Sequence, residues 1–519
     1  MLRAAVLGAL FVLACASTGS AKGAEVAFVP LDDRPVTLQL PQMLGAIAGA
    51  KLDVPPRALL GNYLTFGDPS ALRAWLARDR AAEAYVISTD MLAYGGLVAS
   101  RVPAVDATLA SSRLDALNEL RRTRPRAWIG GFATVMRLAP TGVPALGAAA
   151  NFFAASPLWE GLQEYANLHD PPLPAEEADA TRLRGLLGPA LPAYLDTRKR
   201  NLDVDLHAVQ LVGNGALDYL VLGQDDAGPV GLHLKDVASL RAAIDAAGVA
   251  PRTSVEPGAD ELGMALMARV LARHAGWTPR VAVRYSRPGG AAFNDPLEFA
   301  PIDVTIDRLI GLCGATRDDA TPEIELFVRL PNASEAEDRA TLDALSAEVE
   351  RNRSAALVDL SFLEPTFVSQ ERFARALVSR GIAGKLDAYA SWNTTANSAG
   401  TALAETIAAG AGRRSGTYDE RAHAEFTLNR YVDDVGFHDD VRPELNAALD
   451  VRGVPDHTYL LPDEAALTDH ENRAALVRRA DSWRDAVFPQ YRYASLRIVL
   501  PWDRTFETQI DLTLSPASL

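Results

Sequence analysis

Short apolar runs that end in acidic, Asn or Gly residues recur along this chain. They occupy residues 26–33, 84–96, 127–137, 218–231, 253–263, 281–290 and 386–400. A run of this length predicts a buried strand, and the polar residues behind it then lie at the strand's carboxyl end. Two further strand candidates cover residues 323–330 and 355–364.

Amphipathic segments alternate with these runs. Leu72, Trp75 and Leu76 fall on one face of a helix predicted over residues 69–80, and a Ser–Glu cap begins a helix predicted over residues 334–351. Alternating strands and helices predict a mostly parallel sheet. We expect an α/β domain like a (β/α)8 barrel, because polar strand ends recur from the first strand to the last. An open doubly wound parallel sheet is the alternative.

The barrel-like domain is expected over residues 25–411. An insertion at residues 140–217, which is rich in Pro and Ala, interrupts the alternation of predicted strands and helices. The segment 412–519 is different in kind, with helical stretches followed by two strand-like runs. We interpret it as a mainly helical C-terminal extension that packs against the sheet.

The N-terminus has the pattern of an export signal. Arg3 precedes an apolar run over residues 4–14 that is too short to span a bilayer. Cleavage after small residues would make 1–21 the signal peptide. The run also ends in Leu-Ala-Cys, which resembles a lipobox; residues 1–14 would then be removed and a lipidated Cys15 would anchor the protein to a membrane. Either way we expect an exported protein, whether periplasmic, secreted or a membrane-anchored lipoprotein.

Charge and cysteine content narrow the classes of partner. The 519 residues carry a net charge of −15, and no basic stretch offsets the acid, which argues against nucleic-acid binding. The cysteine content bears on disulfide formation and on nucleophilic chemistry. The two cysteines are Cys15 and Cys313. If the signal is cut, Cys313 has no partner for a disulfide. It lies in the small-residue run GLCGA with no His nearby, so we predict a core thiol rather than a nucleophile.

The sharpest candidate for chemistry is the pair Asp225-Asp226, which follows the apolar run YLVLG. Two carboxylates in one cleft push their pKa values apart, so one can act as an acid while the other stays charged. A glycosidase needs such a pair, and a divalent cation can use it as ligands. The alternative is that one Asp caps the next helix while the other faces solvent.

Charged residues also follow the other strands. Arg34 either forms a salt bridge that orients its acidic neighbours or binds the ligand directly. Arg137 either binds the ligand or is the partner in a buried ion pair. Acidic residues there can instead cap helices or complement the helix dipole. Asp260 joins the Asp pair as a catalytic candidate. The substrate-binding candidates in these segments are Asp32, Asp33, Arg34, Asp90, Tyr94, Arg137 and Glu261.

Trp392 and Asn393 follow the last run of the domain. A Trp on a pocket rim stacks on the apolar face of a sugar, and Asn393 and Asn397 could exchange hydrogen bonds with its hydroxyl groups. In the alternative interpretation, Trp392 belongs to the core and Asn397 caps the next helix.

Several familiar site patterns are missing from the sequence. No HExxH, HxH or CxxC spacing supports a zinc site. No GxSxG elbow supports an α/β-hydrolase triad, and no GxGxxG follows the first strand. We therefore predict neither a bound metal nor a cofactor.

Six ordered motifs carry a family resemblance: VPLDDRPV, STDMLAYGGLVASR, VMRLAP, LGQDDAGPVG, PGADELG and YASWNTTANSAG. Together with the late segment LPWDRTFE they resemble the bacterial family of unknown function DUF4127, over nearly the whole mature chain. A second, weaker likeness is to retaining N-acetylhexosaminidases with substrate-assisted catalysis. That likeness implies that Asp225 orients the acetamido group of the substrate and that Asp226 is the general acid.

The expected function is that of an exported glycoside hydrolase acting on a cell-envelope or environmental glycan, so the expected partner is a carbohydrate substrate. Asp226 would protonate the leaving oxygen, and Asp225 or Asp260 would stabilise the positive charge. Two alternatives stay open: a metal-dependent hydrolase of esters or phosphoesters, and a non-catalytic glycan-binding protein of the envelope.

Overall fold

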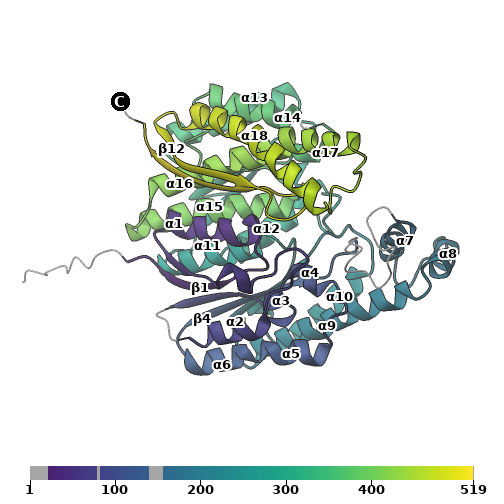
Figure 1. Cartoon of the computed structure of the whole chain (residues 1–519). Helices are drawn as coiled ribbons and strands as arrows, with labels where there is room; N and C mark the ends of the chain where they lie inside the picture. The colour runs from purple at the N-terminus through teal and green to yellow at the C-terminus, as the bar shows by residue number, and fades with distance from the viewer. Residues whose placement is uncertain (1–21, 79–81, 140–155, 367, 518–519) are drawn as a thin grey trace, which may run out of the picture.

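The computed structural model describes residues 22–78, 82–139, 156–366 and 368–517, so the proposed signal and Cys15 lie outside the described residues. The described strands form two open parallel sheets and one antiparallel hairpin (Figure 1). The first sheet has the order β2-β1-β3-β4-β5-β6. Its strands are β1 (Glu25–Val29), β2 (Lys51–Asp53), β3 (Ala84–Ser88), β4 (Trp128–Val135), β5 (Tyr219–Gln224) and β6 (Thr253–Pro257).

The second sheet has the order β11-β10-β9-β7-β8. Counted from the first strand of each sheet, both share the 2-1-3-4-5 order of doubly wound folds, and the first sheet adds β6 at its edge. Ligands of such folds bind outside the carboxyl ends of the strands. The strands of the second sheet are β7 (Arg280–Tyr285), β8 (Thr316–Arg317), β9 (Ile324–Arg329), β10 (Ser354–Asp359) and β11 (Ala388–Ala390).

The expected closed barrel is therefore not formed, and the open parallel sheet describes the fold. The physical reason lies in two helices, α11 (Leu262–His274) and α15 (Thr395–Ser415). A helix outside a barrel keeps a face in water, whereas α11 and most of α15 are buried all round. Both lie between the two sheets, together with α1 (Leu40–Ile47) and α12 (Ile302–Leu312) (Figure 1).

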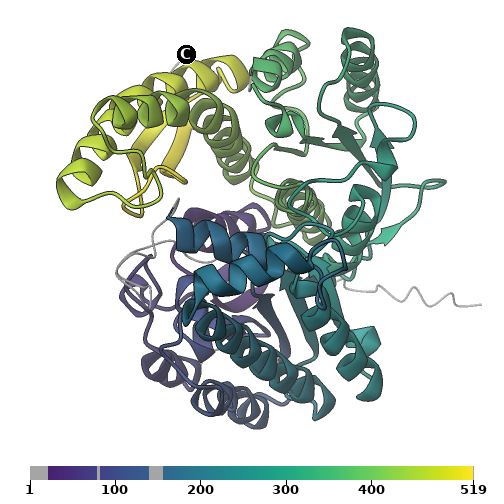
Figure 2. The same ribbon diagram turned by 90° about the vertical axis from the view of Figure 1, so that its right-hand side faces the viewer.

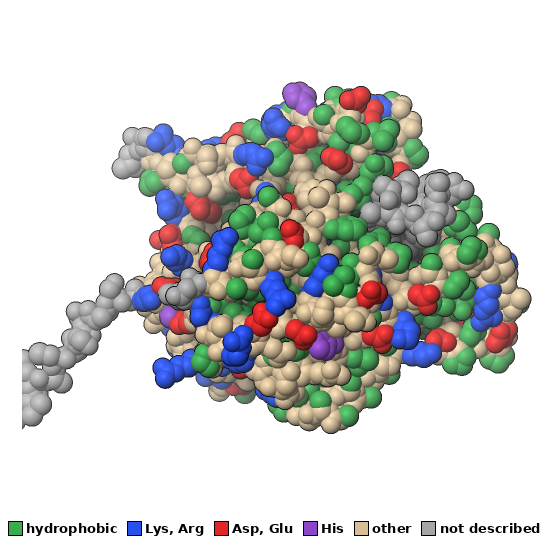
Figure 3. Space-filling view, turned by 60° about the horizontal axis from the view of Figure 1, so that its bottom comes forward, with side chains coloured by type: hydrophobic (Ala, Val, Ile, Leu, Met, Phe, Trp, Pro, Cys, Tyr) green, Lys and Arg blue, Asp and Glu red, His purple; other side chains and the backbone are tan. Residues whose placement is uncertain are grey.

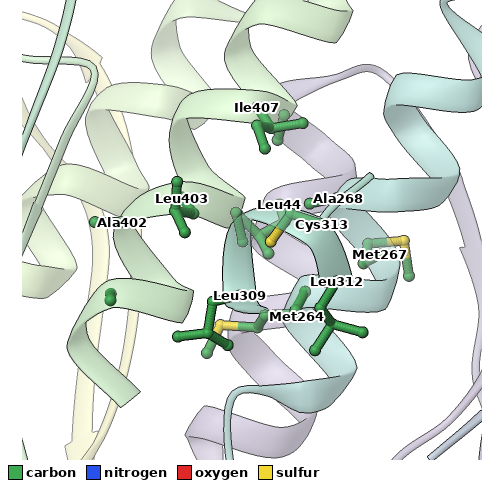
Figure 4. Packing of buried hydrophobic residues seen from close by; sticks show 14 of the residues in the cluster. Leu44, Met264, Met267, Ala268, Leu309, Leu312, Cys313, Ala402, Leu403 and Ile407 are labelled. Carbon is green, nitrogen blue, oxygen red and sulfur yellow. The ribbon is translucent and has the colours of Figure 1, made fainter. Parts of the chain in front are cut away.

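The largest core fills this central layer. Along β1, Val26 and Phe28 belong to this core, whereas Ala27 and Val29 face the helices on the other side of the sheet. Figure 4 shows the central packing, in which Cys313 lies among aliphatic and methionine side chains. The thiol is fully buried, which confirms the prediction of a core cysteine.

Further helices cover the outer faces, which gives five layers in all (Figure 1). The first sheet is covered by α2 (Pro69–Leu76), α3 (Thr89–Ala93), α5 (Ala107–Leu114), α6 (Ala116–Thr123), α9 (Ala190–Gly213) and α10 (His233–Ala246). The second is covered by α13 (Glu335–Glu350), α14 (Val368–Ser379), α16 (Glu420–Arg430), a π-helix (Tyr431–Val441) and α18 (Pro462–Val487).

The C-terminal segment packs on the second sheet and reaches the edge of the first (Figure 2). Its two strand-like runs form the hairpin of β12 (Tyr491–Val499) and β13 (Gln509–Pro516), and α17 (Arg442–Val451) precedes α18. The insertion contains α7 (Pro157–Ala166) and α8 (Glu177–Leu187) before α9, while residues 140–155 lie outside the described residues. The long α9 is thus part of the layer over the first sheet.

All nine predicted strand runs contain a strand of the two sheets. The short β2 and β8 escaped prediction because edge strands of two or three residues carry no apolar pattern. Basic and acidic side chains are interspersed over the face in Figure 3. In the described part of the chain, no helix has the length and apolar character that a membrane span requires.

Candidate functional site

A cavity of about 310 Å³ lies at the carboxyl ends of the first sheet. Its wall comes from segments far apart in sequence: the loops after β1 to β7, the start of α15, α7 of the insertion, the segment between α17 and α18, and the loop between β12 and β13. Such a volume is at the small end of the range for ligand sites. The charged lining residues are Arg34, Arg101, Arg137, Asp225, Asp226, Asp260, Glu298 and Arg504.

The cavity unites about half of the residues predicted from the sequence. Those that line it are Arg34, Arg137, Asp225, Asp226, Asp260, Asn393 and Asn397. The others are buried behind its wall or in the core, namely Asp32, Asp33, Asp90, Tyr94, Glu261 and Trp392. The carboxyl ends of parallel strands meet at one edge, so polar strand ends predicted the location of the cavity.

Arg34 is clamped between two carboxylates. Its Nε donates to Asp32, and its Nη1 and Nη2 form a bidentate pair with Asp260 at 3.1 and 2.7 Å. Because burial is offset by these two acids, the pKa of Arg34 lies well above its ordinary value. The clamp ties the loop after β1 to the loop after β6 and fixes the orientation of the Asp260 carboxylate.

Asp33 anchors the C-terminal segment to the first sheet. Its Oδ1 accepts a hydrogen bond from Trp502 Nε1 at 2.8 Å, and its Oδ2 accepts one from Asn62 at 3.0 Å. Trp502 stacks on Tyr63 with ring centroids 5.0 Å apart. The role of Asp33 is therefore to hold an aromatic wall of the cavity, which the sequence could not show because the partners are 469 residues apart.

The Asp225-Asp226 pair faces two guanidinium groups. Arg101 forms a close ion pair with Asp225, and both side chains are nearly buried. Arg137 Nη1 lies 3.7 Å from Asp226 Oδ2, and its Nε donates to the carbonyl of Ala139. Burial and the charge of Asp225 raise the pKa of Asp226 to about 6. Burial and the nearby Arg101 lower the pKa of Arg137 to about 10.

Asp226 is the carboxylate of this group with the greatest access to the cavity. Its side chain is 34% exposed, compared with 9% for Asp225 and 12% for Asp260. A proton donor has to reach the ligand, so the accessible carboxyl with the raised pKa suits that task. Asp225 and Asp260, each paired with an arginine, are suited to present fixed negative charge.

Asp90 and the Tyr94-Gly95-Gly96 turn support the wall from behind. Asp90 Oδ2 accepts a hydrogen bond from the backbone N–H of Thr134 at 2.8 Å, which links α3 to β4. Burial raises the pKa of Asp90 to about 6. Gly95 has a φ of +96° and its carbonyl accepts from Gly67 N–H, so the glycines allow two loops to cross closely. The Tyr94 ring lies against Arg200 and does not line the cavity.

Glu261 connects the two sheets through α15. Its Oε2 accepts a hydrogen bond from Asn397 Nδ2 at 2.6 Å, and Asn393 donates in turn to Asn397 Oδ1 at 2.6 Å. Burial raises the pKa of Glu261 to about 8. Gly258, with a φ of +92°, passes so close that a Cβ there would lie 2.1 Å from Glu261 Oε1. Thr394 rather than Asn397 caps α15.

The position of Trp392 differs from the predicted one on the rim of the pocket. Its side chain lies in the central core and its Nε1 donates to Thr401 Oγ1 at 3.2 Å, so it does not stand on the rim. The indole ring fits into the core because residues at the start of α15, such as Ala396 and Ala399, are small. The aromatic rings on the cavity wall are instead those of Tyr63, Trp159, Trp502 and Phe506.

Sequence reasoning missed three kinds of lining residue. Arg101, Trp502 and Arg504 lie within the motifs of the family resemblance, but nothing local marks them as site residues. Glu298 carried no signal, although it binds Thr305 Oγ1 at 2.8 Å and the N-terminal backbone of α15. Burial and Asp295 raise the pKa of Glu298 to about 8. The polar-aromatic composition of WDRTFE between two strands was the one usable hint.

The arrangement of His, Cys, Asp and Glu side chains shows whether the described residues could ligate a metal ion. Among the described residues, no group of three or more His, Cys, Asp and Glu side chains is arranged to hold a metal ion. The cavity carboxylates Asp225 and Asp260 already have arginine partners.

Comparison with known proteins gives a family and no activity. A family profile described as "Protein of unknown function (DUF4127)" matches residues 26–511. No curated protein and no solved structure matches the chain.

Proposed function

The chain belongs to the DUF4127 family, and we propose from its cavity that it is an exported glycoside hydrolase acting on a cell-envelope or environmental glycan. One observation carries the proposal. An accessible carboxyl with a pKa of about 6, Asp226, shares the cavity with two arginine-paired carboxylates, Asp225 and Asp260. This is the combination of a proton donor and fixed negative charge that glycosidic cleavage requires.

In the proposed mechanism, Asp226 donates its proton to the leaving glycosidic oxygen. As the glycosidic C–O bond breaks, positive charge develops on the sugar ring, and Asp225 or Asp260 stabilises it. A water molecule then bonds to the anomeric carbon, and the proton that it loses returns to the Asp226 carboxylate. The arginine partners hold these carboxylates in place, so little reorganisation is needed during the reaction. Trp159 and Phe506, the half-buried aromatic residues of the cavity lining, offer apolar surface for a sugar ring.

The arginine partners also separate this proposal from a metal-dependent hydrolase. A divalent cation bound by Asp225 or Asp260 would have to displace Arg101 or Arg34, at the cost of a buried ion pair. Proton transfer by Asp226 leaves both pairs intact. The glycosidase therefore accounts for the arginines, whereas the metal site does not.

The test is hydrolysis of a panel of aryl glycosides by the wild type and by Asp226→Asn. We expect the variant to lose about 10²- to 10⁴-fold in kcat/KM with poor leaving groups and far less with a 2,4-dinitrophenyl group, which leaves without a proton. Asp343→Asn, an exposed ion-pair partner of Arg380, is the matched control. Equal losses for both leaving groups, or wild-type turnover of no glycoside, would refute the proposal.

The pH profile gives a second readout. The acid must carry its proton, so kcat/KM should fall as the pH rises above about 6, the pKa of Asp226. The alkaline limb should vanish in whatever activity Asp226→Asn retains with the 2,4-dinitrophenyl substrate. Glycan binding without turnover would point instead to a binding protein.

A further inference from the structure

Arg137 is the least compensated arginine of the cavity. Arg34 is paired with Asp32 and Asp260, Arg101 with Asp225, and Arg504 with Glu507. Within the described part of the chain, Arg137 Nη1 approaches Asp226 only to 3.7 Å, which is beyond hydrogen-bonding distance. Its side chain is 23% exposed and lines the cavity.

This loose contact conflicts with the task proposed for Asp226. A proton donor is neutral before the reaction, and a neutral Asp226 provides no counter-charge for Arg137. The guanidinium would then be a partly buried cation with Arg101 and Arg504 as like-charged neighbours, and its remaining acidic neighbour, Asp225, is already paired with Arg101. An unpaired cation in such a place is unfavourable unless the ligand supplies an anion.

We propose that the substrate is an acidic glycan, whose carboxylate or sulfate group pairs with Arg137 and leaves Asp226 free to keep its proton. The inference rests on the proposed glycosidase function and names its substrate class. The planar guanidinium can bind such a group through two parallel hydrogen bonds. With Arg137 engaged by the ligand, its attraction for the charged form of Asp226 is weakened, so the proton is retained when the correct substrate is bound.

The decisive experiment compares substrates that differ only in the anionic group. Aryl glucuronides and galacturonides are set against the corresponding glucosides and galactosides, with 6-O-sulfated glycosides as a further arm. We expect the wild type to prefer the acidic member of at least one pair by about 100-fold or more in kcat/KM, because leaving a partly buried cation without its partner is costly. Preference for the carboxylated or for the sulfated series identifies the group.

Variants of Arg137 connect that preference to the residue. Arg137→Met should abolish the preference for the acidic substrate. Arg137→Lys should retain part of it, because the positive charge remains while the two parallel N–H donors of the guanidinium are lost. Arg380→Met, which removes a distant partly exposed ion pair with Asp343, is the control. In the wild type, the acidic substrate should also shift the alkaline limb of kcat to higher pH than the neutral substrate does. A purely structural role of Arg137 would not produce that shift.

The outcomes separate this inference from the proposed function. Turnover of neutral glycosides at the same rate as acidic ones, unaffected by Arg137→Met, overturns the inference and leaves the glycosidase intact. Calorimetric binding of glucuronate or galacturonate that depends on Arg137, without turnover of any glycoside, supports the anionic ligand and overturns the glycosidase. Absence of both binding and turnover overturns both.

Discussion

Replacing Glu261 by glutamine should make the protein more stable at neutral pH. Burial raises the pKa of Glu261 from an ordinary 4.5 to about 8. Because the folded state binds this proton more tightly than the unfolded state, the stability from Glu261 is complete below pH 4.5 and is lost as the pH rises to 8. The glutamine amide cannot ionise, so the Glu261→Gln variant escapes this loss.

The magnitude follows from the pKa shift. Each pKa unit corresponds to about 1.4 kcal/mol, so at pH 7 the wild type has lost about 3 kcal/mol relative to its stability below pH 4.5. In the variant, the oxygen of the new side-chain amide can still accept the hydrogen bond from Asn397. We therefore expect the gain of the variant over the wild type to rise from about 1 kcal/mol at pH 5 to about 4 kcal/mol at pH 8.

The assay is urea unfolding of both proteins at pH 5, 6, 7 and 8. The difference in the free energy of unfolding should grow with pH across this range; Glu335→Gln, which changes an exposed carboxylate in the first turn of α13, is the matched control. A pH-independent difference between wild type and Glu261→Gln would show that Glu261 is already ionised in the fold and would refute the reasoning.

Three further predictions address the packing around the site. Arg34→Met leaves the carboxylate of Asp260 unpaired and should destabilise the protein by about 3–5 kcal/mol in urea unfolding; a loss below about 1 kcal/mol would contradict the clamp. Gly258→Ala places a Cβ against Glu261 at a φ of +92° and should lower stability by about 1–3 kcal/mol, with unchanged thermal unfolding as the contrary result. Cys313 is fully buried with a pKa raised to about 12, so a thiol reagent should label it only after unfolding; rapid labelling of the native protein would show an open core.

The sequence determined the individual elements of this fold. Apolar runs of strand length and polar strand ends located nine strands, because local hydrophobic pattern and turn chemistry act within a few residues. The same pattern predicted that Arg34, Asp225, Asp226 and Asp260 would meet, since all follow parallel strands of one sheet. Between Thr395 and Gly412, α15 carries a single charged residue, Glu405, and this scarcity of charge was the available sign in the sequence against a barrel.

The tertiary structure decided how these elements combine. Strand order depends on long-range packing, and two open sheets around a shared helical layer have the same local pattern as one barrel. The wall from Trp502 and Arg504, and the Asp33 hydrogen bond that holds it, join ends of the chain that no local rule connects. Burial of Trp392 likewise depended on which side of α15 its ring packs. The sequence thus determined which residues lie at strand ends, and only the three-dimensional packing decided which of them share a cavity, because shielding from water and charge pairing arise between distant segments.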